Sequence, residues 1–212
     1  MNSHTGRNAA AFVASLLLLA SPMFAVNLVT NPSFAGSTAG WNLNPSTTYD
    51  STNDATGVPG SGSAKLPFAA GGPSTTVAVD QCIATGPGTY TLGGKVLIPS
   101  GQSVGGSGII TVSFFSGGNC TTGLLFFDSL STSATGSFVT LSKTTTAPAG
   151  TTNAWVTGQN SATGAGTHTV NYDDFVFDNG VAAAIPALGP VGLMAMMIAL
   201  AGVALVTLRS RG

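Results

Sequence analysis

Short runs of strand-forming residues, separated by glycine-rich and proline-rich turns, constrain the fold of this chain most strongly. Several runs alternate between polar and apolar side chains, as in 75–79 and 110–114, which is the period-two pattern of half-buried strands. Turn signals such as Gly86-Pro87-Gly88 lie between the runs. Regularly spaced strands of this kind predict an all-β fold, a β-sandwich or jelly roll. The predicted strands are 26–29, 75–79, 90–98, 109–115, 138–141, 154–157 and 168–177.

The chain carries very few charged residues. They make up 6% of the sequence, against about 25% in typical domains, and glutamate is absent. Between residues 26 and 179, three lysines stand against seven aspartates, which leaves a net charge of −4. Without a basic surface to neutralise phosphates, nucleic acid is not an expected partner. The polar surface must come from Thr, Ser, Asn and Gly, which favour strands and turns over helices.

The N-terminus has the order of regions that is typical of a secretory signal peptide. Arg7 precedes an apolar run at 9–20, and a segment follows that contains Pro22 and ends on the small residue Ala25. The run is shorter than the roughly 20 residues that a membrane-spanning helix needs. We therefore expect residues 1–25 to be a signal helix that signal peptidase removes after Ala25, and a domain at 26–179 to be exported.

A second apolar stretch lies near the C-terminus. Residues 187–208 contain no charged side chain, and as a helix they would extend about 33 Å, enough to cross a bilayer. Arg209 and Arg211 follow at once, and basic residues favour the cytoplasmic side. The pattern predicts a transmembrane helix at 187–208 and a basic cytoplasmic tail at 209–212, with the domain facing outward.

The residues around this stretch resemble a C-terminal sorting signal. Ile185-Pro186-Ala187-Leu188, Gly192-Leu193 and the terminal Arg-Ser-Arg are similar to the IPTL type, which is related to the PEP-CTERM signals that exosortases cut in Gram-negative bacteria. The resemblance implies a bacterial envelope protein that is anchored at first and then processed to the cell surface or the outside. Pro186 would keep the linker 180–186 extended and open to an exosortase-like protease. A plain membrane anchor is the alternative.

The domain between the two ends resembles the galactose-binding-like jelly rolls of carbohydrate-binding modules. Three motifs carry the resemblance: 27–34 followed by Gly40-Trp41, then 88–92, and finally 171–177 with its acidic pair. The resemblance implies that the first motif opens the domain, that the acidic pair lies on the last strand, and that a structural calcium ion joins the two. Ala35 stands after Phe34, where that superfamily usually has an acid.

The cysteines predict a disulfide. Cys82 and Cys120 are the only two, and export would place them in an oxidising compartment. A metal or catalytic role would need more partners than two residues so far apart supply. The disulfide would stabilise the fold by about 4 kcal/mol on the chain-entropy model.

Asp173 and Asp174 form the only acidic pair. Successive strand residues face opposite ways, so the two carboxylates cannot act together as the facing pair that a glycosidase needs. Carboxylates suit calcium, and a calcium site is one interpretation. The one we favour is an ordinary solvated or capped pair. No other cofactor is indicated.

Other side chains give weaker signals. His168 is the only histidine after residue 25, and without a nucleophile motif we expect it on the surface and the chain not to be an enzyme. Sugar binding needs exposed aromatic rings. Tyr49, in a predicted polar loop, is the stacking candidate, whereas Trp155 and Tyr90 are expected in the core.

Two functions from different classes fit this sequence. The main prediction is a structural or interaction protein of the cell surface or extracellular matrix, which needs only a stable, disulfide-linked sandwich. The alternative is a protein like a carbohydrate-binding module that binds extracellular polysaccharide, which needs a surface with exposed aromatic rings.

Overall fold

The computed structural model describes residues 26–179. The predicted signal peptide at 1–25, the linker with Ile185 and Pro186, the helix at 187–208 and the tail with Arg209 and Arg211 lie outside the described residues. Within the described part of the chain, no helix is long and apolar enough to cross a membrane.

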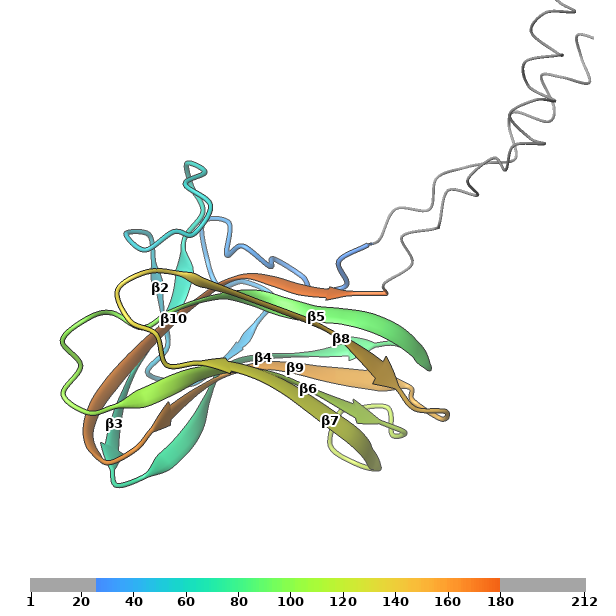
Figure 1. The fold of residues 1–212 in the computed structure, drawn as a ribbon. Helices are drawn as coiled ribbons and strands as arrows, with labels where there is room; N and C mark the ends of the chain where they lie inside the picture. The colour runs from blue at the N-terminus through green and yellow to red at the C-terminus, as the bar shows by residue number, and fades with distance from the viewer. Residues whose placement is uncertain (1–25, 180–212) are drawn as a thin grey trace, which may run out of the picture. The chain divides into compact units, whose positions relative to one another are not determined.

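Two five-stranded sheets pack face to face, and every strand pairing within them is antiparallel (Figure 1). The first sheet has the strand order β1-β4-β9-β6-β7, and the second has the order β2-β3-β10-β5-β8. From β3 onward the chain crosses repeatedly between the sheets, as in jelly rolls. The strands are β1 (Asn42–Leu43), β2 (Thr48–Asp50), β3 (Ser63–Gly71), β4 (Ser74–Ala84), β5 (Gly88–Leu97), β6 (Gly106–Phe115), β7 (Leu124–Thr132), β8 (Val139–Ala147), β9 (Asn153–Ala162) and β10 (Ala165–Asp178).

The core lies between the two sheets and contains many aromatic rings. Tyr90 stacks on Phe177 with ring centroids 4.7 Å apart, and Phe177 in turn contacts Phe114. Tyr90 is buried, which confirms its predicted place in the core. At one end of the sandwich, Trp41 packs on Phe175 with centroids 4.6 Å apart. The opening segment is therefore anchored to the last strand by apolar burial.

The predicted strand at 26–29 is wrong. This segment makes a single bridge, between Asn27 and Asp178, and then turns away from the sheet. After this bridge, Asn31 and Phe34 adopt left-handed backbone conformations, with φ of 48° and 47°, so no strand continues through 31–34. The turn allows the fully buried Phe34 ring to pack against Trp41.

Four strands were not predicted: β1, β2, β3 and β7. The strand β3 contains Pro67, and proline lacks the N–H that a central strand needs. Its neighbour β2 pairs only with Ser63, Ala64 and Lys65, so from Pro67 onward β3 is an edge strand, where proline is tolerated. The strand β7 begins with four exposed apolar side chains at 124–127, and this run hides the alternation that would have identified it.

Candidate functional site

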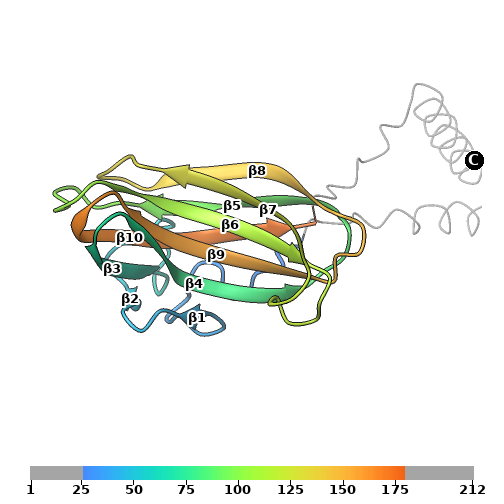
Figure 2. The same ribbon diagram turned by 90° about the horizontal axis from the view of Figure 1, so that it is seen from below.

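The outer face of the first sheet forms a shallow concave surface. Figure 1 shows that the ends of the first sheet bend away from the second sheet while its middle bows toward it, and Figure 2 views the sandwich from below, the side of this concave face. Partners in an antiparallel register point to the same face. Trp155 on β9 is opposite Cys82 on β4 and Ser113 on β6, so these three side chains form one row across the concave face.

Trp155 is the largest side chain of this row. It is half-buried, and its neighbours Ala154 and Val156 point into the core, so the indole points outward. The prediction that Trp155 lies in the core is therefore wrong. Its Nε1 donates to Asp80 Oδ2 at 2.9 Å, and Asn42 Nδ2 donates to the same oxygen at 3.0 Å. These bonds to Asp80 hold the indole in one orientation on the face.

Phe127 extends the same row at the edge of the sheet. Ser113 is the register partner of Phe127 on β7 as well as of Trp155. Neighbouring strands are about 4.8 Å apart, so the two aromatic residues stand about 10 Å apart across the sheet. Phe127 is 62% exposed, and the small Ser113 leaves the space between the rings open. The row therefore offers two aromatic surfaces to a ligand.

A row of polar side chains lies next to the aromatic row. Asp80, Thr157, Thr111 and Ser129 follow one another in register across β4, β9, β6 and β7. In the next row, Gln159 Nε2 donates to Thr157 Oγ1 at 2.9 Å. The three lysines between residues 26 and 179 lie on β3, β5 and β8 of the second sheet. Thr157 and Thr111 are buried, so the polar groups that the concave face exposes beside the aromatic rings are the Asp80 carboxylate, the Gln159 amide and the Ser129 hydroxyl.

The disulfide between Cys82 and Cys120 closes one side of this face. Its Cα atoms are 5.9 Å apart, and the predicted disulfide is confirmed. Because Cys82 points outward beside Trp155, the bond holds the loop 116–123 over the ends of the strands (Figure 2). Asn153 Nδ2 also donates to Gly117 O at 2.9 Å. The loop is therefore a wall that runs beside the aromatic row.

The acidic pair lies on the second sheet, far from this face. A bulge in β10 separates the register positions of Asp173 and Val176, and Asp174 has a φ of 47°. Asp173 is fully buried, and its carboxylate accepts from the backbone N of Ala55 at 2.9 Å and of Asp174 at 2.7 Å. Burial raises the pKa of Asp173 to about 6.

These residues do not fit a calcium site. The cation that contacts Asp174 is the Lys95 ammonium, at 2.8 Å, and Lys95 also donates to Ala55 O at 3.2 Å. A lysine already supplies positive charge where carboxylate and carbonyl oxygens gather. Among the described residues, no group of three or more His, Cys, Asp or Glu side chains could hold a metal ion.

Tyr49 and His168 lie in places that differ from the predicted ones. Tyr49 belongs to β2 rather than to a loop, and its hydroxyl donates to Ser61 O at 3.0 Å; sugar stacking on Tyr49 stays a prediction. His168 is 1% exposed rather than on the surface. It faces the core, where its Nδ1 lies 2.6 Å from Asn160 Oδ1, and burial lowers its pKa.

The sequence does contain a signal that places Phe127 on the concave face, although Phe127 was not among the predicted site residues. Phe126 and Phe127 are consecutive, and because successive strand residues point to opposite sides, only one of them can face the core. Phe126 stacks on the core residue Phe114, which leaves Phe127 outside. Trp155 gave no such signal. Its neighbours Ala154 and Val156 are apolar too, so no alternation in this run shows which of the three side chains points outward.

Comparison with known proteins identifies the fold. No family model and no curated protein matches this sequence, whereas several solved structures resemble the chain. One, described as a family 16 carbohydrate-binding module, aligns with a TM-score of 0.52 and 16% identity over 71% of this chain and 99% of that one. The enzymatically active domain of tailspike protein 4 from bacteriophage CBA120 gives 0.52 and 13% over 72% of this chain and 21% of that one.

An arabinose-bound GH51 α-L-arabinofuranosidase gives a TM-score of 0.51 and 15% identity, over 75% of this chain and 27% of that one. The likeness therefore covers only a part of the tailspike and arabinofuranosidase chains, but almost all of the carbohydrate-binding module. At such low identities these comparisons establish the fold, which is the two-sheet jelly roll found in carbohydrate-binding modules.

Proposed function

We propose that this domain is a non-catalytic module that binds polysaccharide through the concave outer face of the first sheet. The observation that carries the proposal is the row Trp155–Ser113–Phe127 beside the polar row that begins at Asp80. The likeness in fold to a structure described as a carbohydrate-binding module supports it.

The chemistry of the two rows suits a sugar chain. A pyranose ring has C–H groups on its faces and hydroxyls around its rim, so it packs on an aromatic ring and hydrogen-bonds to polar groups beside it. Two rings about 10 Å apart match contacts with two sugar units along an extended chain. The row crosses the strands and reaches the free edge at β7, so a chain can continue past the module.

The charges favour a neutral polysaccharide. Asp80 is a carboxylate on the face, and the lysines of the domain lie on the other sheet. Lys143 reaches the edge of the first sheet, but its ammonium is paired with Asp128 on β7 at 2.6 Å. An acidic polysaccharide would therefore meet the Asp80 charge without an unpaired lysine of the described residues beside it, which lowers both its rate of approach and its affinity.

Affinity gel electrophoresis tests the proposal directly. The full-length chain, kept in a detergent without a sugar headgroup, would be run through gels that contain a neutral glucan, xylan, mannan or galactan, with alginate as the acidic comparison. We expect retardation by at least one neutral polymer. Trp155→Ala and Phe127→Ala should each weaken it about tenfold, the loss of one well-packed aromatic contact.

Val58→Ala is the matched control, because Val58 is also exposed, at 58%, but lies in a loop next to the second sheet. It should leave retardation unchanged. Binding that survives the combined Trp155→Ala and Phe127→Ala substitutions would show that the concave face is not the site. If instead Tyr49→Ala abolishes binding, the aromatic site lies on β2.

We further propose that the module works at the cell surface or outside the cell, as the predicted signals at the two ends of the chain imply. The disulfide supports this location, because such bonds persist in oxidising compartments. Mass spectrometry of the mature protein would test it. A chain that begins at Val26 and ends near Pro186 would agree with export and sorting, and an intact Met1 would contradict export.

A further inference from the structure

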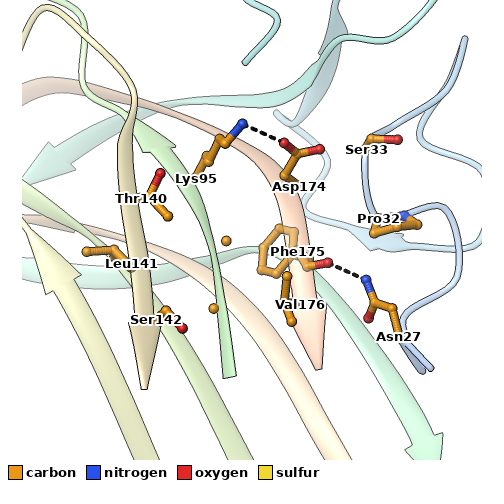
Figure 3. Close-up of a pocket in the computed structure, with 12 residues that line it drawn as sticks. Asn27, Pro32, Ser33, Lys95, Thr140, Leu141, Ser142, Asp174, Phe175 and Val176 are labelled. Atoms are coloured by element: carbon orange, nitrogen blue, oxygen red, sulfur yellow. Dashed lines mark hydrogen bonds and ion pairs between the residues drawn. The ribbon is translucent and has the colours of Figure 1, made fainter. Parts of the chain in front are cut away.

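A second hollow lies on the outer face of the second sheet, on the side of the sandwich away from the concave face. Its volume is about 380 Å³, which falls within the usual range of about 300–1,000 Å³ for ligand pockets. Figure 3 shows its two walls. The opening segment with Pro32 and Ser33 forms one wall, and β8 with Thr140 and Ser142 forms the other. The floor is made by β5 and β10.

The wall formed by the opening segment is held firmly against β10. Asn27 Nδ2 donates to Phe175 O at 2.7 Å, and Asn27 Oδ1 accepts from Phe177 N at 3.1 Å. Phe175 N in turn donates to Pro32 O at 3.0 Å. Gly93, opposite Val176 in register, brings no side chain to the floor between the walls. The hollow is therefore preformed.

The polar groups around the hollow have unused hydrogen-bonding capacity. The hydroxyls of Ser33, Thr140 and Ser142 bond to no other group in the described part of the chain. Lys95 Nζ uses two of its three donors, one on Asp174 Oδ2 and one on Ala55 O. The second carboxylate oxygen of Asp174 accepts no bond from the described residues. One donor and one acceptor thus stand side by side at one end of the hollow (Figure 3).

We propose that this hollow is a second binding site, which takes a single neutral pyranose such as the terminal residue of a glycan. Neighbouring hydroxyls on a pyranose can each donate and accept, so two of them match the free donor of Lys95 and the free acceptor of Asp174. The hydroxyls of Ser33, Thr140 and Ser142 would contact the rest of the rim. Val176 provides apolar contact for the C–H groups.

The same features distinguish the ligand from other classes. Lys95 is already paired with Asp174, so the hollow offers no uncompensated positive charge to an anion such as phosphate. It also lacks the outward row of aromatic rings that suits a long chain. With polysaccharide on the concave face and a terminal sugar here, one module would join two glycans. The site stands on its own residues and does not depend on the concave face.

NMR titration of the full-length chain, in a detergent without a sugar headgroup, tests the proposal. The probes are methyl β-D-glucopyranoside, methyl β-D-galactopyranoside and methyl α-D-mannopyranoside, with inorganic phosphate as the charged comparison. We expect at least one glycoside to shift the amide signals of Gly93, Lys95 and Ser142 saturably, with a dissociation constant in the millimolar range. Phosphate should not shift them.

The variant Thr140→Val/Ser142→Ala removes two hydroxyls that have no protein partner, so the fold should be retained. Loss of two hydrogen bonds at their usual net strength weakens binding about tenfold. The matched control is Thr144→Val/Thr146→Ala. These two positions lie later on the same strand and are also exposed, but they are outside the hollow. It should bind like the wild type.

Absence of glycoside shifts at these amides, equal affinity in the Thr140→Val/Ser142→Ala variant, or a preference for phosphate would each overturn the proposal. Trp155→Ala separates it from the proposed function. That substitution should weaken polysaccharide retardation and leave the glycoside shifts around Gly93 as they are.

Discussion

Removal of the disulfide should destabilise the domain by an amount that the structure allows us to calculate. The bond closes a loop between Cys82 and Cys120, which are 38 residues apart. For a loop of this length, the chain-entropy model gives about 4 kcal/mol of stabilisation at 25 °C. For a domain of this size, each kcal/mol shifts the melting temperature by roughly 2–4 °C. The Cys82→Ala/Cys120→Ala variant should therefore melt about 8–16 °C lower than the wild type.

Urea unfolding followed by tryptophan fluorescence measures this loss. Trp41 is buried and Trp155 is half-buried, so both report on exposure of the domain. Adding a reductant to the wild type should reproduce the variant, and adding it to the variant should change nothing. A loss below about 1 kcal/mol would refute the reasoning, because the disulfide would then not restrict the unfolded chain as the model assumes.

The same variant has a second consequence at the concave face. The disulfide holds the loop 116–123 beside Trp155, so its removal should also weaken polysaccharide retardation at temperatures where the variant is folded. Undiminished binding by the folded variant would show that the loop is not a wall of the site.

Three further predictions concern single side chains. Asp80→Ala removes the acceptor for Trp155 Nε1 and Asn42 Nδ2. Polysaccharide binding should therefore fall severalfold, while the melting temperature changes little. Unchanged binding would mean that the orientation of the indole is unimportant. Burial raises the pKa of Asp173 from 3.8 to about 6, so the folded state binds a proton more tightly than the unfolded state does. The free energy of unfolding should therefore fall by up to about 3 kcal/mol as the pH rises from about 4 through 6. Urea unfolding across this range should show that dependence in the wild type and not in Asp173→Asn; a parallel dependence in both would contradict it. Because Lys95 contacts Asp174 and Ala55 O, a chelator should leave the melting temperature nearly unchanged, whereas a large loss that Asp174→Ala abolishes would reveal a calcium site.

Local patterns in the sequence determined the fold class and the disulfide. The alternation of Ile110, Val112 and Phe114 with Thr111 and Ser113 predicts a strand with one buried face, and the structure buries the three apolar side chains fully. This pattern can be read locally because successive strand residues point to opposite sides. The disulfide could be predicted because only two cysteines were present to pair.

Only the tertiary structure decided which groups come together. Whether Trp155 faces the core or the outside depends on the register of β9 against β4 and β6, and that register is set by pairing between segments far apart in the chain. Pro67 is compatible with β3 only because β2 pairs with β3 no further than Lys65, which leaves Pro67 on a free edge. Lys95 contacts Asp174 because β5 pairs with β10 and a bulge turns the aspartate toward it. A local pattern identifies strands, but the rows of side chains that could bind a ligand arise only when strands pair across the sheet.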